Sequence, residues 1–137
     1  MTTYDRTQAF ASAAWLLRGI SSVPGQLVLN SGLLSFSTNH PGSAWPWQIR
    51  KLERQLGAEG FAQALLAGEQ CTLFQWRMGS FAWHSPWYVF GGGINLTHNG
   101  QKLRISFGDQ TSGMNEVDAM RKLGQAWLEV LGQASQP

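Results

Sequence analysis

The chain has 137 residues, of which 43% are hydrophobic and only 13% are charged. This length and apolar content suit one domain with a core of its own, so we expect a single domain over residues 1–137. The formal net charge is +2, and the ten lysines and arginines are scattered along the chain. Because binding to a phosphate backbone depends on a dense basic stripe, we expect no nucleic-acid partner.

The sequence carries no pattern typical of export or of a membrane span. Cys71 is the single cysteine, so an intramolecular disulfide is excluded. Residues 1–19 lack the basic start and long apolar run of a signal peptide. No stretch reaches the roughly 18 consecutive apolar residues of a transmembrane helix. We therefore expect a cytoplasmic protein.

The first strand is expected over residues 13–21, after a loose polar N-terminus over residues 1–11. A helix over residues 5–17 is the competing interpretation, because four apolar residues recur there at helical spacing. These residues are Phe10, Ala13, Ala14 and Leu17. The sequence alone leaves both interpretations open.

Alternating apolar residues predict two further strands on either side of a short turn. Pro24-Gly25 predicts a first turn, which leads into a strand over residues 26–30. Ser31-Gly32 belongs to the turn that follows this strand. Leu34 and Phe36 then continue the alternation, so we expect a third strand antiparallel to the second.

From residue 46 to residue 68 the apolar spacing changes from that of a strand to that of a helix. Ile49, Leu52 and Leu56 fall on one helical face. A second short amphipathic turn follows, and Gly68 is well placed to end it. We therefore expect a helical insertion over residues 46–68, between strands.

Strand alternation returns at Cys71. Its phase slips by one residue at Gly79-Ser80, and a slip of this kind predicts a β-bulge. The alternating residues are Phe74, Trp76 and Met78 before the slip, and Phe81 and Trp83 after it.

The next strand is expected over residues 87–97, with Pro86 at its start. Its three glycines, residues 91–93, predict a bend or a close approach of two backbones. Asn99-Gly100 is the strongest hairpin signal in the chain, because both residues accept the positive φ of a type I′ turn. The returning strand is expected over residues 101–107.

A terminal amphipathic helix is expected over residues 114–132. Asn115 suits the N-cap, and Gly132 suits the C′ position just beyond the last turn. The apolar stripe consists of Val117, Met120, Gly124, Trp127 and Leu131.

Residues 25–36, residues 81–107 and the terminal helix together resemble the pleckstrin-homology superfold. The resemblance is greatest to its GRAM-type branch, in a form seen in bacterial proteins with no assigned role. It implies a mainly β (α+β) fold, in which a bent antiparallel sheet closes into a barrel and the C-terminal helix caps one open end. The insertion over residues 46–68 departs from the family, which has a short loop at this place.

No catalytic pattern stands out in the sequence. Gly-x-Ser-x-Gly is absent, His40 and His98 lie in predicted turns as solvated polar residues, and Cys71 is expected to be a buried structural thiol. His84 lies at a predicted strand end, where an ordinary hydrogen-bonded histidine is the favoured interpretation. We therefore expect no enzyme, no cofactor and no metal site. A small enzyme that uses His84 as a proton shuttle is a third hypothesis.

The binding candidates are concentrated at the start of the insertion. Arg50, Lys51 and Arg54 form a basic cluster, preceded by Trp45 and Trp47. The favoured interpretation of the cluster is a solvated face with Glu53 as a local partner, and a contact with anionic lipid or acidic protein is the alternative. The two tryptophans are expected in the core or in a lid, with an exposed binding anchor as the alternative.

The leading hypothesis is a non-catalytic interaction module with an unidentified protein partner, bound through an edge strand or the insertion. The alternative is a module that binds an anionic lipid or small ligand through Trp45, Trp47, Arg50 and Arg54. A membrane surface has weak support, because the net charge is small. Phosphoinositide-binding members of the superfold carry several basic residues around the first strand pair, where this chain offers Arg18 alone.

Overall fold

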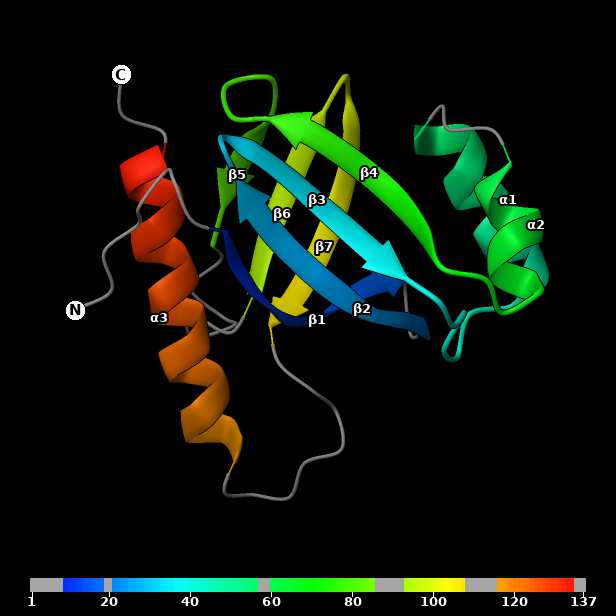
Figure 1. Ribbon diagram of the computed structural model, residues 1–137, viewed down its shortest axis with the longest axis horizontal. Helices are drawn as coiled ribbons and strands as arrows, with labels where there is room; N and C mark the ends of the chain where they lie inside the picture. The colour runs from blue at the N-terminus through cyan, green and yellow to red at the C-terminus, as the bar shows by residue number, and fades with distance from the viewer. Residues whose placement is uncertain (1–8, 19–20, 57–59, 86–92, 108–115, 135–137) are drawn as a thin grey trace.

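The computed structural model describes residues 9–18, 21–56, 60–85, 93–107 and 116–134. The strands in these ranges are β1 (Phe10–Arg18), β2 (Ser21–Asn30), β3 (Leu33–Thr38), β4 (Cys71–Arg77), β5 (Ala82–His84), β6 (Gly93–His98) and β7 (Gln101–Phe107). The helices are α1 (Pro46–Leu56), α2 (Phe61–Leu66) and α3 (Glu116–Ala134). The described part of the chain is therefore mainly β with helices added (Figure 1), as the α+β prediction requires.

The strands form one antiparallel sheet in the order β4-β3-β2-β1-β7-β6-β5. Two of its hairpin turns have the predicted chemistry. Ser31 and Gly32 have φ of 53° and 78°, and Asn99 and Gly100 have φ of 49° and 79°. Positive φ at both central residues matches the right-handed twist of the flanking strands, so both hairpins are confirmed.

The sheet is open between β4 and β5, which are its two edges, although these strands follow each other in the chain. Strands β1 to β4 run across the direction of β5 to β7 (Figure 1). Where the sheet is open, side chains link the two parts. Trp76 of β4 stacks on His98 of β6 with ring centroids 4.4 Å apart. The ring centroid of Phe81 lies 5.8 Å from that of Trp76. Hydrogen bonds between the edge strands therefore do not close a barrel in the described part of the chain.

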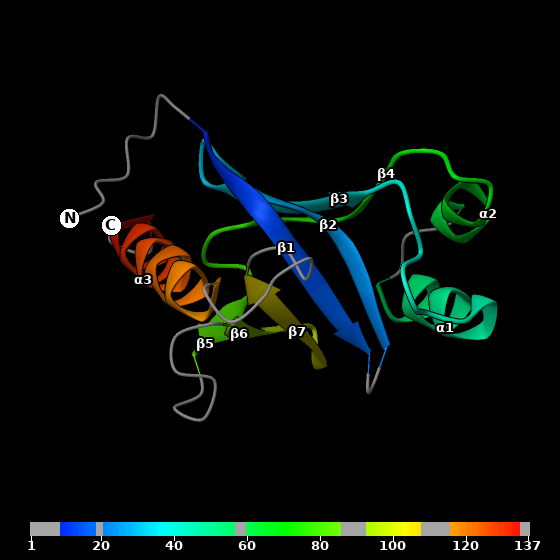
Figure 2. The same cartoon turned by 90° about the horizontal axis from the view of Figure 1, so that it is seen from below.

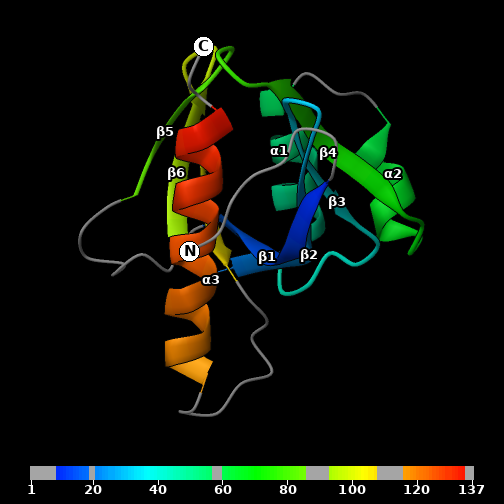
Figure 3. The same cartoon turned by 60° about the vertical axis from the view of Figure 1, so that its left-hand side comes forward.

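The core is one cluster of buried side chains from the bent sheet, from α3, and from α1 and α2. α3 packs against the end of the sheet opposite to the insertion (Figures 1 and 3). Trp127 of α3 is fully buried. Its ring contacts the Phe10 ring edge-on and stacks on the Phe107 ring, with centroid distances of 4.7 and 5.8 Å. Its indole N–H donates to Ser12 Oγ at 2.7 Å, so the one polar group of this side chain is satisfied.

The first strand is confirmed as a strand, and it begins earlier than predicted, at Phe10. The competing helix is wrong for the described residues, because β1 pairs along its length with β2. Pro24-Gly25 does not form a turn either, since β2 runs through both residues. A Cβ at Gly25 would lie 2.6 Å from the Phe36 ring, so this glycine marks a close approach of strands rather than a change of direction.

The predicted bulge at Gly79-Ser80 is wrong. Gly79 has a φ of 94° and lies in the turn between β4 and β5, where the Ser80 N–H donates to the Arg77 carbonyl oxygen. The irregularity falls instead at Leu73, because Phe36 pairs with Phe74 while Ser37 pairs with Thr72. One extra residue on β4 lets Leu73 and Phe74 both be buried.

The terminal helix is confirmed, but it continues through Gly132 to Ala134. Gly132 is not among the glycines with positive φ, so its predicted place at C′ is wrong. Residues 1–8 and 86–92, as well as Asn115, lie outside the described residues. Gly93 opens β6, where a Cβ would lie 2.7 Å from the Ile105 carbonyl oxygen. The expected close backbone approach is therefore confirmed at the last of the three glycines.

Candidate functional site

The helical insertion is confirmed, and α1 and α2 lie side by side at the end of the molecule away from α3 (Figure 2). Ile49 and Leu52 of α1 are fully buried, as is Leu65 of α2. The amphipathic spacing of both helices therefore turns one side of the insertion into the core and leaves the other side in solvent.

The start of α1 is fixed by its own sequence. The Trp45 carbonyl oxygen accepts the N–H groups of Gln48 and Ile49, at 2.9 and 3.1 Å. In return, the Trp45 N–H donates to Gln48 Oε1 at 2.8 Å, which is half of a capping box. Pro46 takes the first helical position, where its missing N–H costs nothing. The helix start that carries the two tryptophans is therefore capped by hydrogen bonds from its own residues.

Trp45 and Trp47 are the most exposed large apolar residues of the described chain, with 64% and 61% of their surface in solvent. The interpretation that they lie in the core is therefore wrong, while a lid and an exposed binding anchor stay predictions. The apolar positions of α1 that face the core are already occupied by Ile49 and Leu52. Trp47 falls two residues before Ile49, which turns it by about 200° to the opposite side of the helix.

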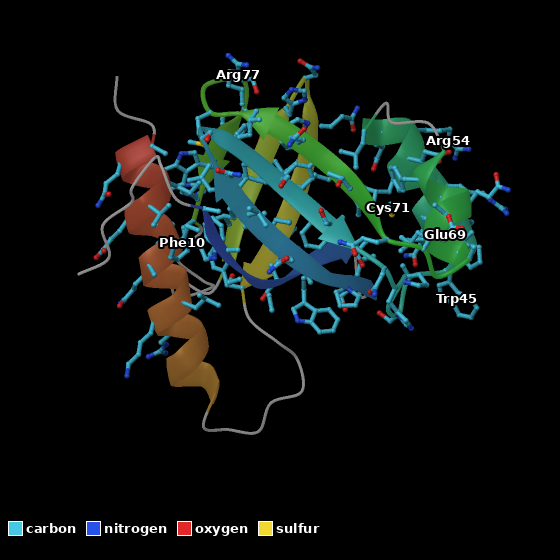
Figure 4. The ribbon with its side chains drawn as sticks, in the orientation of Figure 1. Phe10, Trp45, Arg54, Glu69, Cys71 and Arg77 are labelled. Atoms are coloured by element: carbon cyan, nitrogen blue, oxygen red, sulfur yellow. The ribbon has the colours of Figure 1, made fainter. Side chains whose placement is uncertain are left out.

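The cations of α1 lie on the same outer side as Trp47. Arg50, Lys51 and Arg54 follow Trp47 by three, four and seven residues, the spacing of one helical face, and all three are exposed. From Trp47 to Arg54 this face is about 10 Å long, at about 1.5 Å for each residue. Trp45 lies just before it, at the N-cap of the helix. Figure 4 shows Trp45 and Arg54 at the end of the molecule that carries α1 and α2, away from α3. The α1 surface is the name used below for Trp45, Trp47, Arg50, Lys51 and Arg54.

Glu53 was predicted to be the local partner of the basic cluster, and it has another role. Its Oε2 accepts the backbone N–H groups of Gly60 and Ala62, at 2.9 and 2.8 Å. These groups open α2, whose N-cap Gly60 has no side chain to accept them. Among the described residues, none of the three cations makes an ion pair.

An open groove of about 530 Å³ runs between α1 and α2. Arg50 contributes to its wall, and Leu66, which is 37% exposed, contributes an apolar side chain. The lining residues are Arg50, Glu53, Gly60, Ala62, Gln63 and Leu66. The roles of Glu53 and Leu66 were missed from the sequence. A signal existed for Glu53, because a helix that starts at a glycine needs a capping group from elsewhere.

The three histidines lie apart from this groove. His40 Nδ1 accepts the Gly42 N–H at 2.8 Å, so His40 stabilises the loop in which it lies. His84 is exposed at the end of β5. His98 is half-buried on Trp76, so the prediction of a solvated turn residue is wrong for it.

Cys71 opens β4, as predicted, and it is half-buried. Its thiol lies 4.0 Å from the Phe61 carbonyl oxygen, beside α2. Burial raises the pKa of the Cys71 thiol, because apolar surroundings disfavour the thiolate. In the described ranges, no group of three or more histidine, cysteine or acidic side chains is arranged to hold a metal ion.

Comparison with models of known protein families and with curated proteins finds no match to this chain. Within the described ranges, none of the helices combines the length and the hydrophobicity needed to span a bilayer.

Proposed function

We propose that this protein is a non-catalytic interaction module that binds a partner protein through the α1 surface. The observation that carries the proposal is the exposure of Trp45 and Trp47, at 64% and 61%, on a capped and therefore fixed helix start. Tryptophan and arginine are the residues most enriched among those that dominate binding energy at protein interfaces. A fixed backbone lowers the entropy lost when such side chains are buried by a partner.

A protein suits this surface better than a bilayer does. An interfacial helix binds lipid by burying its apolar face, and the apolar face of α1 already packs in the core through Ile49 and Leu52. Three exposed cations and a net charge of +2 add little attraction to an anionic membrane. The adjoining groove is concave, a shape that receives side chains rather than a flat surface.

The strand order and the terminal helix support an assignment to the pleckstrin-homology superfold, in its GRAM-like form. In that assignment, the open sheet is a bent barrel that is completed by the contact between Trp76 of the edge strand β4 and His98 of β6, the strand next to the other edge. The insertion then supplies the binding surface, which takes the place of the basic first hairpin of lipid-binding members. A cytoplasmic location agrees with a single unpaired cysteine.

Site-specific photo-crosslinking in the native cells tests the proposed function. One variant carries p-benzoylphenylalanine in place of Lys51 on the α1 surface, and its matched control carries it in place of Lys102 on β7, since both lysines are exposed. We expect a discrete protein adduct from position 51 that position 102 does not give. The adduct should disappear when Trp45 and Trp47 are both replaced by alanine.

Two results would contradict the proposal. One is the same set of adducts from both positions, or none from position 51. The other is co-sedimentation with vesicles that contain phosphatidylserine, if alanine at Trp45 and Trp47 abolishes it. That second result would favour the lipid-binding alternative.

A further inference from the structure

We infer that the partner presents an acidic segment with a large apolar side chain. This inference rests on the proposed function and names the chemistry of its partner. The carboxylates of the segment lie on Arg50 and Arg54, and its apolar side chain enters the groove between α1 and α2. Two separate features of the insertion, its charge and its shape, lead to this assignment.

The positive charge of the α1 surface favours an acidic segment of the partner. Arg50 and Arg54 are one turn apart on the same face of α1, and Lys51 adds a third positive charge directly after Arg50 in the sequence. The nearest acid along the helix, Glu53, already accepts two backbone N–H groups of α2. Within the described ranges these three cations have no ion-pair partner. Guanidinium groups donate two parallel hydrogen bonds to a carboxylate, so acidic side chains fit this surface.

The lining of the groove favours an apolar side chain of the partner beside those carboxylates. This lining includes Leu66, which is 37% exposed, and the buried Ala62. Arg50 lines the same groove, so an apolar side chain within it lies next to a cation. A segment with acids alone would leave Leu66 uncovered. A segment with apolar residues alone would leave the arginines unpaired.

A second hollow beside the groove limits where the segment binds. Its volume is about 270 Å³, it shares Gly60 and Gln63 with the groove, and Glu69 is the charged residue that lines it. Like charges repel, so an acidic segment is directed away from this hollow and toward α1. Figure 4 shows Glu69 and Arg54 on the same end of the molecule. Arg50 lines the first groove together with Glu53, whereas Glu69 is the charged residue of the second hollow, so the carboxylates of the segment lie toward Arg50.

Selection from a library of random dodecamer peptides displayed on phage tests this inference with the full chain as target. We expect enriched peptides to combine aspartate or glutamate with leucine, isoleucine, phenylalanine or tryptophan. Arg50→Ala with Arg54→Ala should weaken these peptides by about tenfold, the combined effect of two exposed charge pairs. Leu66→Ala should weaken them as well. The control, Arg77→Ala with Arg104→Ala, removes the same charge from exposed arginines on other elements and should change little.

Circular dichroism melts of each variant show that a loss of binding is not a loss of fold. Enriched peptides without acids, equal weakening by both arginine pairs, or full binding to Leu66→Ala would each overturn the inference. These failures differ from a failure of the proposed function. If position 51 still crosslinks a protein through a segment that is not acidic, the interaction module stands and the inference about its partner falls.

Discussion

The Glu53 carboxylate lies 2.8 Å from the backbone nitrogen of Ala62, across the junction between α1 and α2. The same oxygen accepts the Gly60 N–H at 2.9 Å. A side chain of one helix thus satisfies the first turn of the next helix, whose own N-cap is a glycine. These two hydrogen bonds connect α1 to α2, and the groove lies between the two helices.

Replacement of Glu53 should therefore destabilise the protein through α2. Glu53→Ala should lower the free energy of unfolding by about 1 kcal/mol, the usual effect of losing an N-cap acceptor. Glu53→Gln keeps one acceptor oxygen and should lose less. Glu69→Ala is the control, because Glu69 is exposed and its replacement should stay within about 0.5 kcal/mol of the wild type. Urea unfolding measures all three, and equal effects at Glu53 and Glu69 would contradict the capping role.

The bond from Trp127 to Ser12 joins α3 to β1. Trp127 is fully buried, so its indole N–H has no water to replace a lost acceptor. Ser12→Ala should cost about 1–3 kcal/mol, the penalty of a buried unsatisfied donor. In Trp127→Phe the donor is absent, and a further Ser12→Ala change should then cost much less. A double-mutant cycle by chemical denaturation measures this coupling, and additive effects would show that the bond contributes nothing.

Gly132 tests where α3 ends. It lies within the helix, and a Cβ built there meets nothing within 4 Å. Gly132→Ala should therefore stabilise the protein by about 0.5–1 kcal/mol, because alanine loses less backbone entropy in a helix. If Gly132 were the left-handed C′ residue, the same change would destabilise it. Thermal unfolding of the variant distinguishes the two by the sign of the change.

Replacement of Gly25 by alanine should have the opposite effect to replacement of Gly132. A Cβ at this position would lie 2.6 Å from the Phe36 ring, inside the contact between β2 and β3. Gly25→Ala should lower the free energy of unfolding by about 1–3 kcal/mol, because an overpacked core must shift to admit the methyl group. A neutral Gly25→Ala in the same denaturation experiment would mean that the two strands are not so closely packed.

The parts of this fold that sequence reasoning predicted are those that depend on local chemistry. Asn99-Gly100 predicted its hairpin because the two residues tolerate a positive φ wherever they stand in a protein. The insertion was predicted because Ile49, Leu52 and Leu56 repeat at the helical period. Neither inference needed a distant part of the chain.

The errors came from features that depend on distant residues. Gly25 resembles a turn glycine until β3 is placed beside it, and only then does its contact with Phe36 explain it. The bulge at Leu73 depends on the partner residues Phe36 and Ser37, which no local pattern reveals. The core or a lid was the favoured place for Trp45 and Trp47, yet the core-facing side of α1 is already filled by Ile49 and Leu52.

Cys71 links stability to pH at the contact between the insertion and the sheet. Its thiol is half-buried near Phe61, and burial raises its pKa because the thiolate is poorly solvated there. The unfolded chain therefore releases this proton at a lower pH than the folded protein does. The stability that the thiol contributes is fully present below the pKa of an unfolded cysteine, about 8.5. It is lost as the pH rises through the folded-state pKa.

The difference in free energy of unfolding between the wild type and Cys71→Ala isolates this effect, because other groups titrate in both proteins. We expect the difference to be constant from about pH 6 to about pH 8 and to move against the wild type above that range. Partial exposure of the thiol keeps the change small. A difference that is flat into alkaline pH would show that the folded protein solvates the thiolate as well as the unfolded chain does. A difference that favours the wild type at high pH would mean that a positive group lies near the thiol and lowers its pKa.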